Sequence, residues 1–152
     1  MLSIGDTAPE FEARTHDGQD ISLARFREEG KSVVLYFYPK DETAGCTAQA
    51  CAFRDAYEDF TDAGSVVIGV SHDDEGSHRS FAENHRLPFL LVSDADGSLR
   101  ERFKVPNSLG VVPGRVTYVI DGSGKVVYAF NALLKAKKHV DQALSVIKRL
   151  GR

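Results

Sequence analysis

The sequence predicts an α/β fold in which a central mixed β-sheet is flanked by helices. Three short runs have the β-branched and aromatic composition of buried strands, and the first two are each followed by a segment that reads as a helix. Nearer the C-terminus, two further strand-like runs enclose the turn Asp-Gly-Ser-Gly, which indicates an antiparallel hairpin. Strands joined through helices and followed by a hairpin give a mixed sheet with helices on both sides.

The individual elements follow in chain order. The stretch "FEARTHDGQDISL" alternates around His16-Asp17-Gly18 and predicts an N-terminal β-hairpin. The run "SVVLYFY", residues 32–38, predicts a strand closed by Pro39, because proline cannot donate to a strand ladder. The later elements are a helix over 46–60, a strand over 65–71, a helix over 75–86, a strand over 89–94, a helical turn near Leu99, a hairpin of 115–121 with 125–130, and a helix over 137–150. This order fits a thioredoxin-like fold.

Length and composition narrow the classes of function. The 152 residues contain no repeat, low-complexity tract or linker, which predicts a single domain over residues 1–152. A net charge of −3 argues against nucleic acid as a partner, and the apolar runs are shorter than the ~20 residues of a membrane span. The N-terminus lacks the pattern of a leader peptide, so we expect a cytoplasmic location. Two cysteines in a reducing compartment suggest that any disulfide is a catalytic state.

Both cysteines lie in one stretch, "YPKDETAGCTAQAC". Counted at 3.6 residues per turn, Cys46 belongs to an apolar stripe with Phe53, whereas Cys51 belongs to a polar face with Asp55. Residues five apart in an ideal helix have Cα atoms about 8.7 Å apart. A disulfide needs about 4.4–6.8 Å, so the two thiols can bond only if the first turns of the helix unwind.

The surroundings of Cys46 favour a reactive thiol. The residue lies at a predicted helix N-terminus, where unpaired N–H groups and the helix dipole favour an anion and hence a thiolate nucleophile. Three alternatives remain at this point: two inert small core residues, a structural zinc site, and thioredoxin-type exchange. Zinc lacks a second cysteine pair, and exchange enzymes use Cys-x-x-Cys, which this chain does not contain.

Several other polar residues read as structural. His78 and His85 are seven positions apart and share a helix face, for which we expect solvent exposure in preference to a metal pair. The run "KAKKH", residues 135–139, reads as a charged helix entrance. Phe11, Phe103 and Phe130 are expected in the core.

Pro39, Thr43 and Cys46 form the pattern P-x-x-x-T-x-x-C, which resembles the active-site motif of peroxiredoxins. The second cysteine five residues later is similar to the peroxiredoxin Q (bacterioferritin comigratory protein) subfamily. Further stretches that resemble this subfamily are "GDTAPEF", "GVSHDDEGSHRSF", "LPFLLVSD", "PGRVTYVID" and "HVDQAL", so the resemblance covers nearly the whole chain.

The resemblance implies an atypical 2-Cys thiol peroxidase with a thioredoxin-like fold and without a metal or bound cofactor. It implies that Cys46 is the peroxidatic cysteine, oxidised to a sulfenic acid, and that Cys51 is the resolving cysteine of a Cys46–Cys51 disulfide. Thr43, Pro39 and Arg115 match the other active-site residues of the family. The implied partners are H2O2 or an organic hydroperoxide and a thioredoxin or glutaredoxin-type reductant, and we expect a monomer or weak dimer.

The chemistry indicates what else the site needs. A lowered thiol pKa raises the thiolate fraction but reduces its nucleophilicity, so the net gain is only a few-fold. Donors aimed at the peroxide oxygens must supply more, and Arg115, Thr43 and the Gly45–Cys46 backbone are the expected ones. Gly45 permits a close approach of substrate, and Pro39 shields the thiolate. At position 44, alanine replaces the proline common in the subfamily, which adds backbone freedom.

Two other classes of function use the same cysteines. One is a protein thiol-disulfide oxidoreductase, and the other is a peroxide-responsive redox sensor. Neither class needs Thr43 and Arg115 beside the thiols, so the position of these two residues separates the classes.

Overall fold

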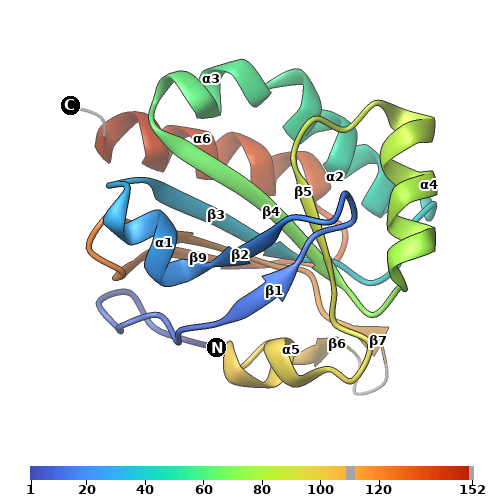
Figure 1. The fold of residues 1–152 in the computed structure, drawn as a ribbon, viewed down its shortest axis with the longest axis horizontal. Helices are drawn as coiled ribbons and strands as arrows, with labels where there is room; N and C mark the ends of the chain where they lie inside the picture. Colours follow the sequence, from blue (N-terminus) through green and yellow to red (C-terminus); the bar gives the residue numbers. More distant parts are fainter. Residues whose placement is uncertain (109–111, 151–152) are drawn as a thin grey trace.

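The computed structural model describes residues 1–108 and 112–150 (Figure 1). Its centre is a five-stranded sheet in the order β5-β4-β3-β8-β9. Strands β3 (Ser32–Phe37), β4 (Ser65–Ser71) and β5 (Leu90–Ser93) run parallel to one another, and β8 (Val116–Ile120) pairs antiparallel with β3 and with β9 (Val126–Asn131). The predicted mixed sheet is therefore confirmed.

Two layers of helices and loops cover the sheet. The face under α2 (Ala44–Asp55), α3 (Tyr57–Asp62), α4 (Glu75–His85) and α6 (Ala136–Leu150) holds one hydrophobic core. In Figure 1 α2, α3 and α6 lie together on one side of the sheet, whereas the N-terminal hairpin and α5 (Ser98–Arg102) lie on the other. Alternate side chains of β3 divide between the two cores, since successive residues of a strand point to opposite faces.

The second core lies under the smaller elements. The predicted N-terminal hairpin is confirmed, and its strands pair antiparallel. The Ser22 hydroxyl accepts the N–H of Arg25 and caps a short helix that the sequence analysis missed. The bounds on this side are β1 (Glu12–Arg14), β2 (Asp20–Ser22), α1 (Leu23–Glu28), α5 (Ser98–Arg102), β6 (Asn107–Ser108) and β7 (Val112–Pro113). Short strands such as β6 and β7 carry too few residues for a periodic signal.

The predicted helix over residues 46–60 is in fact two helices. Helix α2 begins two residues earlier, at Ala44, and ends at Asp55. Ala56 leaves the helical conformation, with φ −98° and ψ 4°, and α3 starts at the next residue. Phe53 and Phe60 are nevertheless both fully buried, so the break keeps the apolar side of each helix against the sheet. Over the two described ranges, no helix is long and apolar enough to cross a membrane.

Candidate active site

Cys46 lies in the first turn of α2, with its side chain in the core between that helix and the sheet. The residue is 2% exposed, and both cysteines are free thiols. Arg115, directly before β8, is 3% exposed and donates from Nη2 to Cys46 Sγ over 3.3 Å. The structure therefore brings together two residues that are 69 positions apart. It places the permanent positive charge of Arg115 beside the Cys46 sulfur.

The Arg115 guanidinium is fixed by two further acceptors. Its Nε donates to the Leu133 carbonyl over 2.8 Å, and its Nη1 donates to Gln49 Oε1 over 2.5 Å. Gln49 is fully buried, three residues after Cys46 on α2. Gln49 was not among the predicted site residues, although a polar residue three positions from a reactive cysteine on a helix is a signal for a neighbour on the same face.

Gly45 makes room for this arrangement. A Cβ at position 45 would lie 3.0 Å from Arg115 Nη2, tighter than nearly all real contacts of this kind. The group close to Gly45 in this structure is the Arg115 guanidinium, and the expected approach of substrate to Gly45 stays a prediction. A side chain at position 45 would therefore require the Arg115 guanidinium to shift by a few tenths of an ångström.

Thr43 and Pro39 precede Cys46 by three and seven residues, and within the described ranges neither is hydrogen-bonded to it. Thr43 is exposed at the N-cap of α2, and its hydroxyl donates to the Lys40 carbonyl over 2.8 Å. The Thr43 hydroxyl does not accept a hydrogen bond from an N–H group of α2. The backbone N–H groups of the first turn are therefore not capped by this side chain. Pro39 is half-buried directly after Tyr38.

Cys51 lies on another face of α2, as predicted. The residue is half-buried and lines a shallow groove between α2, α3 and α6. Asp55, Asp59 and Asp141 contribute carboxylates to the groove, and Lys137 contributes one cation. One unbroken helix carries both cysteines, so they are not at bonding distance in this state.

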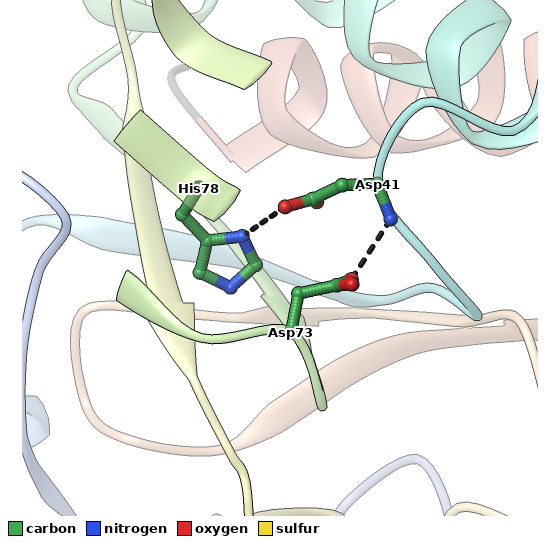
Figure 2. A group of neighbouring side chains, drawn as sticks. All are labelled: Asp41, Asp73 and His78. Atoms are coloured by element: carbon green, nitrogen blue, oxygen red, sulfur yellow. Dashed lines mark hydrogen bonds and ion pairs between the residues drawn. The ribbon is translucent and has the colours of Figure 1, made fainter. Parts of the chain in front are cut away.

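The loop before α2 is tied to α4 by buried and exposed polar contacts. Asp41 Oδ2 lies 2.7 Å from His78 Nδ1, and the Asp41 N–H donates to Asp73 over 2.8 Å (Figure 2). At the exposed end, Glu42 accepts from Asn84 and bonds to His85, and these hydrogen bonds lower the pKa of Glu42. The predicted solvent exposure of His78 is wrong, because the residue is fully buried. The helix face that His78 and His85 share instead binds the loop before α2, through Asp41 and Glu42.

Asp41, Asp73 and His78 are close enough together to be tested as metal ligands. His78 Nε2 faces the Val92 carbonyl at 3.1 Å, so this nitrogen carries a proton. Its Nδ1 faces a carboxylate that also accepts from the hydroxyls of Tyr38 and Ser77. Both ring nitrogens are thus engaged in hydrogen bonds. We interpret the cluster as an anchor of the loop.

A second buried histidine supports the Arg115 side of the site. His139 Nδ1 lies 2.8 Å from the Thr117 hydroxyl and its Nε2 lies 2.7 Å from the Ala132 carbonyl. Burial lowers the pKa of His139 to about 4; the hydrogen bond to Ala132 acts in the opposite direction, and the Arg115 charge lowers it further. The expectation of a charged entrance at residues 135–139 therefore fails for His139, which is neutral and fully buried.

Comparisons with known proteins agree with this geometry. Residues 4–129 match the model described as the AhpC/TSA family. Chloroplastic peroxiredoxin Q from Triticum aestivum is 49% identical over 150 residues, which cover 98% of this chain and 68% of that protein. Peroxidoxin BcpB from Mycobacterium tuberculosis has 33% identity and a TM-score of 0.89, with 99% of both chains covered. Peroxiredoxin Q from Xanthomonas campestris has 29% identity and a TM-score of 0.88, covering 100% of this chain and 98% of that chain.

The same comparisons correct the predicted location and identify the family. The curated relatives from Triticum aestivum, Populus jackii and Arabidopsis thaliana are all named chloroplastic, which points to a plastid and contradicts the cytoplasmic prediction. That prediction took the first residues as evidence of a compartment, which they do not provide. The thioredoxin-like fold and the peroxidase activity are both supported. The chain therefore belongs to the AhpC/TSA family as a peroxiredoxin of the Q type, a thiol peroxidase that reduces peroxides with electrons from a thiol reductant.

Proposed function

We propose that the chain reduces H2O2 and organic hydroperoxides at Cys46. The observation that carries the proposal is the buried Cys46 sulfur 3.3 Å from the Arg115 guanidinium. The thiolate attacks the terminal oxygen of ROOH, an S–O bond forms and the O–O bond breaks. The sulfur becomes a sulfenic acid, and the leaving oxygen takes a proton to become an alcohol, or water from H2O2.

We propose distinct roles in this step for Arg115, Thr43 and Pro39. Arg115 supplies N–H donors and a fixed charge where negative charge passes from sulfur to the leaving oxygen. Thr43 has its hydroxyl hydrogen on the Lys40 carbonyl, so its lone pairs accept the O–H of the hydroperoxide. Pro39 contributes no N–H donor and shields the thiolate from water on the strand side.

Cys51 resolves the sulfenic acid. Its thiol attacks the Cys46 sulfur, a disulfide forms and water leaves. The two residues lie on one unbroken helix, so the turns between residues 44 and 51 unwind before the S–S bond forms. A thioredoxin or glutaredoxin-type dithiol then reduces the disulfide by exchange, and the half-exposed Cys51 is the sulfur it reaches first.

We also propose that residues 1–152 form a single domain that acts as a monomer or weak dimer. One sheet carries both hydrophobic cores, which supports a single folding unit. The large exposed apolar side chains recorded for the described ranges do not form one broad patch. They are Met1, Ile4, Leu134 and Leu150, located at the N-terminus, before α6 and at the end of α6.

The two rival classes gain no specific support. A protein disulfide would have to reach Cys46, which is 2% exposed, whereas a hydroperoxide group is small. A sensor without catalysis needs no guanidinium on the sulfur. The position of Arg115 therefore favours peroxide reduction over both alternatives.

The proposal is tested by NADPH consumption with peroxide, thioredoxin and thioredoxin reductase. We expect turnover with the natural chain and none with Cys46→Ser. Cys51→Ser should consume about one peroxide per protein and then stop, because its sulfenic acid has no resolving thiol. Turnover that persists in Cys46→Ser would overturn the assignment of roles. A natural chain that reacts with peroxide no faster than free cysteine would overturn the function itself.

A further inference from the structure

A second arginine, Arg100, is buried near the active site and has no role in the mechanism described so far. It lies on α5, is 6% exposed, and its guanidinium carbon is 5.7 Å from the centroid of the Phe37 ring. Burial lowers its pKa, while the charges of Asp94 and Cys46 act in the opposite direction. Burying a guanidinium is costly unless its donors are satisfied, so its contacts require an explanation.

The guanidinium bridges the ends of two strands. Its Nη1 donates to the Gly114 carbonyl over 3.0 Å, and its Nη2 donates to the Tyr38 carbonyl over 3.1 Å. The last residue pair of the β3–β8 ladder is Phe37 with Val116, so both carbonyls lie just beyond it. Arg100 therefore joins the segment after β3 to the segment before β8, at the point where the backbone pairing of these two strands stops.

Each of these carbonyls belongs to the peptide group directly before a residue of the site. The peptide bond is planar, so holding the carbonyl of one residue also holds the N and Cα of the next. The Tyr38 carbonyl fixes the plane that leads into Pro39, and the Gly114 carbonyl fixes the plane that leads into Arg115. One planar guanidinium fork thus sets two backbone segments relative to each other.

The segment that follows α5 packs closely against Gly114, one of the two residues whose carbonyls Arg100 holds. A Cβ at Gly114 would lie 2.1 Å from the Pro106 carbonyl oxygen, so only glycine fits at this position. The Asp94 carboxylate accepts the N–H groups of Leu99 and Arg100, which fixes the start of α5. Arg100 therefore projects from an anchored helix onto a closely packed glycine.

We propose that Arg100 is a positioning residue for peroxide reduction. By holding the peptide groups before Pro39 and Arg115, it keeps the Arg115 guanidinium aligned with the Cys46 sulfur. This role rests on the proposed function of Cys46 and Arg115, and Arg100 itself does not touch the sulfur or the peroxide. A misplacement of about 1 Å in a catalytic group can cost about a hundredfold in rate, so the alignment is measurable.

The test compares substitutions of Arg100 with those of Arg102, a second arginine on α5. Arg102 is exposed and donates to the Glu10 carbonyl, so it is matched in residue type, helix and kind of bond. The rate constant of Cys46 with H2O2 is measured by competition with a haem peroxidase. We expect Arg100→Lys to be about tenfold slower and Arg100→Met about a hundredfold slower, because neither provides a planar fork. Arg102→Lys and Arg102→Met should keep the natural rate.

A double variant separates positioning from a general loss of structure. If Arg100 acts through Arg115, Arg100→Lys should cause no further slowing in an Arg115→Met background. An Arg100→Lys variant that reacts at the natural rate would overturn the proposal, as would an equal slowing in both backgrounds. Should Arg100→Met fail to fold, Arg100→Lys decides the question. A natural chain no faster than free cysteine would instead contradict the proposed function, so the two failures are distinguishable.

Discussion

The two cysteines of α2 lie in contrasting surroundings. Cys46 is buried, with an arginine on its sulfur and a fully buried glutamine behind that arginine. Cys51, on the next turns of the same helix, is half-buried in an open groove whose charged side chains are mostly acidic. A permanent positive charge therefore lies beside the Cys46 sulfur, whereas the charged side chains around Cys51 are mostly negative.

This difference supports the proposed assignment of the two cysteines to different steps. A buried sulfur with fixed donors suits reaction with a small peroxide, and a half-exposed sulfur suits reaction with a protein dithiol. The helix that keeps the two environments apart also keeps the sulfurs apart. The predictions below change the surroundings of Cys46 or the helix that separates the two sulfurs.

The largest effect is expected from Arg115→Met. Removing the donors on the Cys46 sulfur should slow its reaction with peroxide by about 10²–10³-fold. Alkylation of Cys51 by iodoacetamide should stay unchanged. The matched control is Arg54→Met, an arginine at the far end of α2 that donates to the His85 carbonyl. A natural peroxide rate in Arg115→Met would show that the contact with sulfur is incidental.

An intermediate effect is expected from acidification, through His139. Its pKa is about 4 in the folded chain and about 6.5 when unfolded, so the unfolded state binds more protons between these values. The contribution to stability is complete above pH 6.5 and is lost as the pH falls towards 4, by about 3 kcal/mol at most. His139 is hydrogen-bonded to the Ala132 carbonyl, and Arg115 donates to the carbonyl of the next residue, Leu133. The loss of stability on acidification therefore affects the segment that positions Arg115 at Cys46.

Urea denaturation between pH 7.5 and 4 measures this loss. His139→Leu should lower stability at every pH but flatten its dependence on pH. The control His72→Gln removes an exposed histidine and should keep the natural slope. An unchanged slope in His139→Leu would assign the acid sensitivity to other groups.

The smallest effect is expected from Ala44→Pro. Ala44 is the first residue of α2, where proline is well tolerated, and Thr43 has φ −79° and ψ 154°, which suit a residue before proline. The substitution should stabilise the folded first turn by about 0.4–1 kcal/mol. Disulfide formation should then slow by about twofold to fivefold, while peroxide oxidation of Cys46 stays the same. Equal slowing of both steps would contradict the idea that only the second step requires unwinding.

Local patterns predicted the sheet and the cysteines well. The strand over residues 65–71 has the predicted bounds, because a continuous β-branched run depends little on distant contacts. The helical period also placed Cys46 inside and Cys51 on another face, since both positions follow from one helix.

The buried positions of His78, His139 and Arg100 could not be predicted, because their hydrogen-bond partners are distant in sequence. His78 and His139 read as solvent-facing because a polar residue on a helix usually is. Their partners, Asp41 and Thr117, are 37 and 22 residues away and meet them only in the folded chain. Arg100 likewise reaches Tyr38 across 62 residues, from a helix of five residues that has no periodic signal.

Amide hydrogen exchange of the reduced and the peroxide-oxidised chain tests the central claim most directly. Mass spectrometry first shows the loss of two hydrogen atoms that marks the disulfide. The account then predicts much faster exchange over residues 44–51 in the oxidised chain, and unchanged exchange over Glu75–His85 of α4. Oxidised Cys51→Ser should keep the protection of the reduced state. Full protection of residues 44–51 in a chain that carries the Cys46–Cys51 disulfide would contradict the claim that this helix must unwind.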